Sequence, residues 1–221
     1  MQAVGNILPF AIAVAFSGVP IMATILILLS PNRKRSGLPF LIGWLVGLFV
    51  VVVLSALAAQ AVPTSRSPRQ PDTVVGWIEI VLGLALIALT LFTLRRARRR
   101  KEMAIPKWLE SAGSLGPWSA LGLALVLNIR PKALLLAVAA GLTVRADASD
   151  LSDALIAIVV YTVIAGSTVA VPIVGTLLAP EKMEPRLVGT RTWLGRNGEA
   201  LGSIIGIVIG VVIVGMGMAR L

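Results

Sequence analysis

The sequence predicts an all-α integral membrane protein with six transmembrane helices in a 3+3 inverted repeat, of which the first and fourth helices are broken. Three observations lead to this fold class. Hydrophobic residues make up 57% of the 221 residues and charged residues only 14%, whereas a soluble domain carries about 25% charge. Six apolar stretches reach the roughly 20 residues that a helix needs to cross a bilayer. Proline motifs interrupt two of these stretches near their middles.

The six predicted spans are rich in Leu, Ile, Val and Ala, and short polar breaks separate them. Strands of a membrane β-barrel would alternate apolar and polar residues over about ten positions, which these stretches do not do, so helices are expected. The first stretch is interpreted as a span and not as a signal peptide, because residues 1–10 contain no Lys or Arg. The spans are predicted at 4–29, 38–62, 74–94, 115–144, 151–179 and 199–219.

The loops leave no room for a soluble domain, so residues 1–221 are expected to form a single transmembrane domain. Its first repeat is predicted at 1–94 and its second at 115–221, with a basic cytoplasmic loop at 95–114 between them. Because each repeat contains three spans, the two repeats are expected to cross the membrane in opposite directions.

The cations divide unequally between the two sides of the predicted bundle. Loops 30–37, 95–114 and 180–198 hold fourteen of the 20 Lys and Arg residues, whereas the termini and the other two loops hold four. Cytoplasmic loops carry the excess of Lys and Arg in membrane proteins. We therefore expect these three loops to be cytoplasmic and both termini to lie outside, in a bacterial inner (plasma) membrane.

The densest basic run, residues 95–101, has two interpretations. It could be a nucleic-acid patch, or it could contact anionic lipid head groups. Its position directly after a span on the predicted cytoplasmic side favours head groups. Membrane lipids are therefore expected partners, and nucleic acid is not.

Two proline motifs interrupt the first and fourth spans, Ser17-Gly18-Val19-Pro20 and Asn128-Ile129-Arg130-Pro131-Lys132. Proline removes a backbone donor and clashes with the preceding turn. Interrupted apolar segments at corresponding places of two inverted halves indicate a transport site, and a pair of ordinary proline kinks is the alternative. The candidate substrate-binding residues are Ser17, Gly18, Pro20, Asn128, Arg130, Pro131 and Lys132.

Arg130 and Lys132 fall inside the fourth span, where an ionisable side chain is costly and usually faces a cavity or a partner. By the predicted limits, Arg130 lies about 15 helical residues, or roughly 20 Å, from either surface, which is too far for easy snorkelling. A polar cavity is therefore favoured. A guanidinium and an ammonium beside free helix-end amides suit an anionic group such as phosphate, sulfate or carboxylate.

Two further signals concern the other spans. Glu79, the only carboxylate in the third span, is either an interfacial residue that reaches head groups, which is favoured, or a coupling group that carries protons. Small residues spaced four apart permit close helix approach, within one chain by default or across a homodimer. They occur in the second span at Gly43 and Gly47, and in the sixth at Gly202, Gly206 and Gly210.

The chain contains no Cys and no His. Disulfides, thiol chemistry and soft-metal sites are therefore excluded, and the P-loop pattern for ATP is also missing. No nucleophile stands with a base, so we expect no enzyme activity, no cofactor and no bound metal.

Several motifs together resemble the GAP family, the peptidolipid- and sulfolipid-addressing proteins, a branch of the lysine exporter (LysE) superfamily. The resemblance covers most of residues 10–145 and rests on Ser17-Gly18-Val19-Pro20-Ile21, the stretch at 37–47, Pro106-Lys107-Trp108, Pro131-Lys132 and Leu134-Leu135-Leu136-Ala137. Relatives more often carry Asn directly before Pro-Lys, where this chain has Arg130.

The resemblance implies a six-helix inverted-repeat transporter that exports an envelope lipid towards the outer face, either a glycolipid, a peptidolipid or another lipid with an anionic head. Two alternatives stay open. The chain could export a small solute such as an amino acid, or it could be a non-transporting scaffold that partners other envelope-export proteins.

Overall fold

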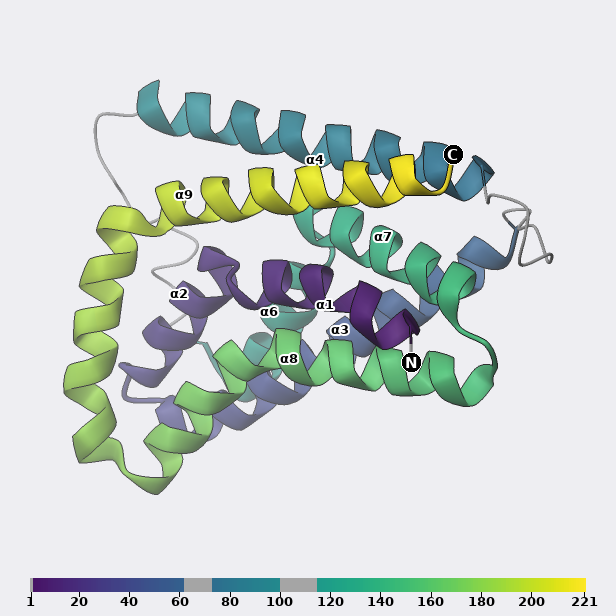
Figure 1. Ribbon diagram of the computed structural model, residues 1–221. Helices are drawn as coiled ribbons and strands as arrows, with labels where there is room; N and C mark the ends of the chain where they lie inside the picture. The colour runs from purple at the N-terminus through teal and green to yellow at the C-terminus, as the bar shows by residue number, and fades with distance from the viewer. Residues whose placement is uncertain (1, 62–72, 100–114) are drawn as a thin grey trace.

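The computed structural model describes residues 2–61, 73–99 and 115–221, in which helices follow one another with short connections and no β-strand occurs (Figure 1). The predicted basic loop at 95–114 and the loop after the second span fall largely outside these ranges. The helices are α1 (Gln2–Ala15), α2 (Gly18–Leu28), α3 (Arg33–Ala58), the short 3-10 helix η1 (Ala59–Ala61), α4 (Thr73–Arg99), α6 (Pro117–Asn128), α7 (Pro131–Asp147), α8 (Leu151–Leu178) and α9 (Pro180–Ala219).

Four of these helices contain apolar stretches long enough to cross a membrane, namely α3, α4, α8 and the second part of α9. Two helix pairs reach the same length together but are bent, α1 with α2 by 51° and α6 with α7 by 64°. If each bent pair is one span, the total is six. The helices are those of a multi-pass membrane protein, and the two bends confirm the breaks expected in the first and fourth spans.

The local sequence explains why the chain breaks at these two points. Ser17 and Arg130 precede α2 and α7, and both have extended backbones, with ψ of 115° and 147°. Pro131 follows Arg130 directly, and the residue before a proline is driven out of the helical region. Both Pro20 and Pro131 then lie in a first helical turn, where the missing N–H has no helical partner to lose.

Helices α4 and α9 lie side by side along one side of the molecule (Figure 1). Glycines bring their backbones together: a β-carbon on Gly83 would lie 2.7 Å from the Gly210 carbonyl oxygen, and one on Gly217 would lie 2.6 Å from the Gly76 oxygen. Similarly, a β-carbon on Gly43 would meet the backbone of α6. These small residues therefore pack helices within one chain.

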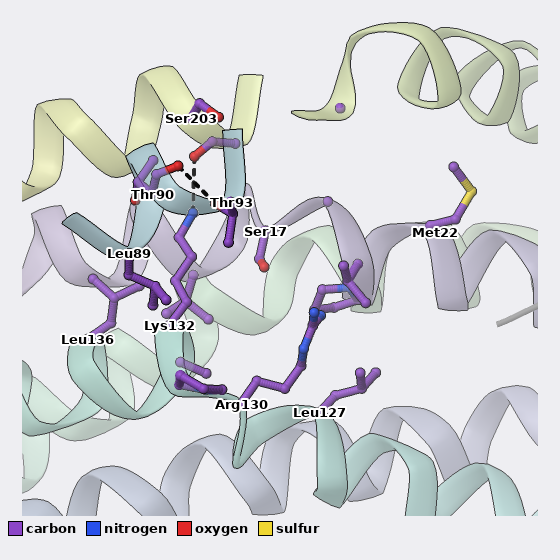
Figure 2. Close-up of a pocket in the computed structure, with 18 of the residues that line it drawn as sticks. Ser17, Met22, Leu89, Thr90, Thr93, Leu127, Arg130, Lys132, Leu136 and Ser203 are labelled. Carbon is purple, nitrogen blue, oxygen red and sulfur yellow. Dashed lines mark hydrogen bonds between the residues drawn. The ribbon is translucent and has the colours of Figure 1, made fainter. Parts of the chain in front are cut away.

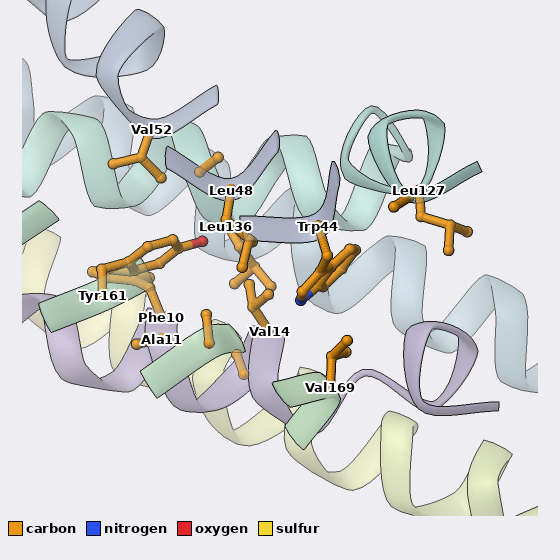
Figure 3. Packing of buried hydrophobic residues seen from close by; sticks show 14 of the residues in the cluster. Phe10, Ala11, Val14, Trp44, Leu48, Val52, Leu127, Leu136, Tyr161 and Val169 are labelled. Atoms are coloured by element: carbon orange, nitrogen blue, oxygen red, sulfur yellow. The ribbon is translucent and has the colours of Figure 1, made fainter. Parts of the chain in front are cut away.

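The hydrophobic core lies where α1, α3, α7 and α8 meet (Figure 3). Its largest side chains are fully buried, among them Phe10, Trp44, Leu136 and Tyr161. Many large apolar side chains also point outward, and Val163 and Val171, for example, are 62% and 67% exposed. Helices that are apolar on both the inner and outer faces suit a bilayer better than water.

The sequence-based limits were wrong at all three predicted basic loops, and at the second of them residues 95–99 are still part of α4. Residues 180–198 are helical and form the first part of α9, which crosses the end of the molecule before α9 turns into its apolar part (Figure 1). Residues 33–37, predicted as loop, begin α3. Hydropathy marks where a helix is apolar, and not where it ends. In α9 a buried pair seven residues apart, Leu187 and Leu194, holds the polar part of the helix against the bundle.

Candidate functional site

A cavity of about 470 Å³ lies where the two helix breaks come together (Figure 2). Its walls come from the start of α2, the far end of α4, the start of α7 and the bend of α9. The volume is in the range of small-molecule sites. The structure brings six of the seven predicted site residues to this cavity: Ser17, Gly18, Pro20, Arg130, Pro131 and Lys132.

The two cations of the cavity have different surroundings. Lys132 Nζ donates a hydrogen bond of 3.1 Å to the Gly202 carbonyl oxygen on α9, as Figure 2 shows. Arg130 is accessible from the cavity and, within the described part of the chain, makes no hydrogen bond or ion pair. None of the described lining residues is Asp or Glu. The guanidinium is therefore free to bind a ligand, and Lys132 keeps two of its three ammonium hydrogens for the same purpose.

Two helix N-termini also face the cavity, because α2 begins at Gly18 and α7 begins at Pro131. The first amides of a helix have no partner within that helix, and the helix dipole favours negative charge there. Ser17 adds a hydroxyl that makes no hydrogen bond to the described residues. Cations, helix-end amides and this hydroxyl are all donors, so the cavity is chemically suited to an anion.

Sequence reasoning missed the cavity wall that α4 and α9 supply. Thr90 and Thr93 line it, but their hydroxyls donate to Leu86 and Thr90 carbonyls of their own helix. Gly198 and Gly202 of α9 line it as well. The spacing of the α9 glycines was the only signal in the sequence, and it could not separate a cavity wall from helix packing.

Asn128 is the predicted site residue that the structure does not bring to the cavity. Its side chain is buried, its Nδ2 donates a 3.0 Å hydrogen bond to the Ala124 oxygen, and it packs on Gly47 of α3. The bend turns α6 and α7 in different directions, so neighbours in one motif face different sides. Asn128 therefore joins α6 to α3.

Glu79 lies away from the cavity and is fully buried. The Nε of Arg220 lies 3.0 Å from its Oε2, and Arg220 also binds Asp147 with an Nη2–Oδ2 distance of 2.8 Å. This position does not match an interfacial residue that reaches lipid head groups. Nothing in the sequence separation of Glu79, Asp147 and Arg220 indicates that these three residues meet.

A second, apolar groove of about 700 Å³ lies between α3, α6 and α7. One stripe of α7, formed by Leu134, Val138 and Leu142, lines this groove, whereas Lys132 and Leu136 line the cavity from the other face. Ile129 faces the groove and the next residue, Arg130, faces the cavity. The break of the fourth span is thus the point at which a polar and an apolar site meet.

Comparison with known protein families gives a match over most of the chain. Residues 7–219 match the family model of Sap, the sulfolipid-1-addressing protein. No curated protein and no solved structure matches the chain. The match agrees with the lipid-addressing family that the motifs resemble, while the wider placement in the lysine exporter superfamily stays a prediction. Because nearly the whole chain is matched, it belongs to the sulfolipid-1-addressing protein family.

Proposed function

We propose that this chain transports an envelope lipid with an anionic head group across the membrane, and that Arg130 and Lys132 hold the head group. One observation carries the proposal: two cations and two helix N-termini share a cavity whose described lining has no acidic residue. Cations at membrane depth without a counter-charge are costly, so an anionic ligand would stabilise this arrangement. Membership of a lipid-addressing family favours a lipid over a small solute.

The apolar surroundings of the cavity support a lipid as well. Leu89, Leu127 and Leu136 line the cavity beside the cations. The apolar groove begins at Ile129, one residue from Arg130, and is open to the face that the spanning helices turn outward. A lipid with its head at Arg130 can keep its chains against such surfaces, whereas a small hydrophilic solute would gain nothing from them.

The helix pairing supports the proposed 3+3 inverted repeat. A two-fold relation between the halves would exchange α1 with α6, α2 with α7, α3 with α8 and α4 with α9. Many contacts between the described helices occur in such matching pairs: α1–α8 is matched by α6–α3, α2–α9 by α7–α4, and α2–α3 by α7–α8, whereas α1–α7 and α8–α9 have no counterpart of similar extent. The contacts α3–α8 and α4–α9 are also consistent with this relation, because the exchange converts each of these pairs into itself. Alternating access around a central site is the usual consequence of this architecture.

The charge distribution supports export towards the outer face. The cation-rich segments 30–37, 95–114 and 180–198 are proposed to be cytoplasmic. The cavity lies in the half of the molecule that holds the start of α2 and the bend of α9, which is the proposed cytoplasmic half. A lipid from the inner leaflet would therefore meet Arg130 first. We propose transport without catalysis, cofactor or metal.

The test is translocation in proteoliposomes that contain a fluorescent sulfated glycolipid or, for comparison, a zwitterionic phosphatidylcholine analogue. The Arg130→Ala/Lys132→Ala double variant should move the sulfated lipid at least about tenfold more slowly, as expected when charge-assisted contacts are lost. Arg145→Ala is the matched control, because it removes a cation from the same helix outside the cavity.

Each outcome decides between the functions. A loss specific to the sulfated lipid supports the proposal. Unchanged translocation by the double variant would exclude the role given to Arg130 and Lys132. If the wild-type protein moves neither lipid but carries an amino acid, the solute exporter is correct. If it moves nothing alone, the scaffold is the better explanation.

A further inference from the structure

A buried ionic cluster joins four helices at the end of the molecule where both termini lie, here called the termini end (Figure 1). Arg220 follows α9 and bridges Glu79 of α4 and Asp147 of α7. Asn6 of α1 donates a 2.9 Å hydrogen bond to Asp147 Oδ2. The side chains of Glu79, Asp147 and Arg220 are only 1%, 9% and 16% exposed.

The cluster is separate from the cavity. Along α4, Glu79 is ten residues from Leu89, the nearest cavity residue of that helix, which is about 15 Å in a helix. Along α7, Asp147 is eleven residues from Leu136, which is about 16 Å. Fully buried side chains such as Leu86 and Thr143 fill the region between them. Packed side chains therefore separate the cavity from the termini end.

The cluster crosses a boundary between two packed units. The backbones of α4 and α9 approach closely at two pairs of glycines, Gly76 with Gly217 and Gly83 with Gly210. Such a pair moves as one body, because its helices cannot slide without steric clash. Glu79 and Arg220 both belong to this pair, whereas Asp147 belongs to α7. The Arg220–Asp147 ion pair therefore links the α4–α9 unit to the rest of the bundle.

We infer that the Arg220–Asp147 ion pair is a latch that holds the termini end closed while the cavity is open to the other end. The pair separates when the α4–α9 unit moves away and the cavity opens towards the termini end. Glu79 is a positioning residue that keeps Arg220 aimed at Asp147. This inference rests on the transport proposed above, since a transported head group must leave on the side opposite to its entry.

Water entry makes such a latch reversible. Separating two buried charges is very unfavourable when either stays buried, but not when both become hydrated. Opening of the termini end would admit water to this cluster first. The closed state is thus stabilised by the pair, and the open state by hydration of the same three side chains.

Cysteine accessibility tests the latch without any lipid substrate. The chain has no Cys, so a single introduced thiol reports one position. A thiol introduced by Thr143→Cys reports water access to the packed region between the cavity and the cluster, and one introduced by Ala133→Cys reports water access to the cavity. Rates of reaction with a water-soluble maleimide are measured in lipid nanodiscs, in which both sides are accessible. Asp147→Asn and Glu79→Gln are the latch variants, and Arg145→Gln is the control on the same helix.

The latch predicts opposite changes at the two reporters. In Asp147→Asn the Thr143→Cys rate should rise about tenfold, a typical size for a coupled equilibrium, and the Ala133→Cys rate should fall. Glu79→Gln should give the same pattern to a smaller extent. An unchanged Thr143→Cys rate in Asp147→Asn would overturn the inference. A rise at both reporters would overturn it too, because that indicates loose packing and not opening.

The lipid assay and this assay fail independently. If Arg130→Ala/Lys132→Ala leaves lipid translocation unchanged, the head-group role fails while the labelling result stands. If labelling in Asp147→Asn matches that in Arg145→Gln, the latch fails while the binding role of the two cations stands.

Discussion

Replacement of Gly83 by alanine tests the packing of α4 on α9, on which both the cavity wall and the proposed latch depend. A β-carbon at this position would lie 2.7 Å from the Gly210 oxygen and 2.9 Å from the Val214 nitrogen. Both are backbone atoms, which cannot rotate away. Overpacking of this kind costs about 1–3 kcal/mol, so the helices must separate to accept the methyl group.

The intrinsic preference for helix acts in the opposite direction, since alanine is favoured over glycine by about 1 kcal/mol within a helix. Because the contacts involve backbone, we expect a cost in the upper part of the overpacking range, about 2–3 kcal/mol, and therefore a net loss of about 1–2 kcal/mol. For a chain of this size that corresponds to a fall in Tm of about 2–8 °C.

The assay is thermal unfolding in detergent, with Gly215→Ala as the control. Gly215 lies in the same part of α9, but nothing would lie within 4 Å of its β-carbon, so the control should keep or raise the Tm. Equal Tm values for Gly83→Ala and Gly215→Ala would refute the close backbone packing of α4 and α9.

Three further predictions concern single positions. Asn128→Ala should lower stability by about 1 kcal/mol, because the hydrogen bond to Ala124 is lost, yet leave sulfated-lipid binding unchanged; a binding defect would place Asn128 in the site after all. Leu187→Ala should lower the free energy of unfolding by about 2 kcal/mol or more, because the Leu187 side chain is buried. The control is Val188→Ala, which changes a half-exposed side chain next to it and should have little effect; equal Tm values for the two variants would contradict a packed helix at 180–198. Arg130→Lys should keep most of the lipid binding, whereas Arg130→Gln should lose it, and added salt should weaken binding by the wild-type protein. Equal lipid binding by the two variants would exclude an electrostatic role for Arg130.

Much of the fold could be predicted from the sequence because hydropathy and proline act locally. The spans follow from apolar length, and the two breaks follow from Pro20 and Pro131 in otherwise apolar stretches. The helix at 180–198 was missed because its two inward residues, Leu187 and Leu194, are too few to distinguish an amphipathic helix from a polar loop.

The candidate site was predictable where the motif itself supplies the residues. Arg130 and Lys132 were selected because charge at membrane depth is costly, and both line the cavity. Asn128 belongs to the same motif but faces α3, and the bend of 64° that turns it there cannot be read from residue spacing. The cluster of Glu79, Asp147 and Arg220 depends on contacts between residues up to 141 positions apart, so no local pattern reveals it.

The central claim is that a lipid head group binds between the two broken helices. The most direct measurement is an experimental map of the protein reconstituted with a sulfated glycolipid, examined between Pro20 and Pro131. Our account predicts head-group density in hydrogen-bond contact with Arg130 and Lys132, with chain density that leaves along apolar helix surfaces. A small enclosed density without a chain, or lipid bound elsewhere beside an empty cavity, would contradict it.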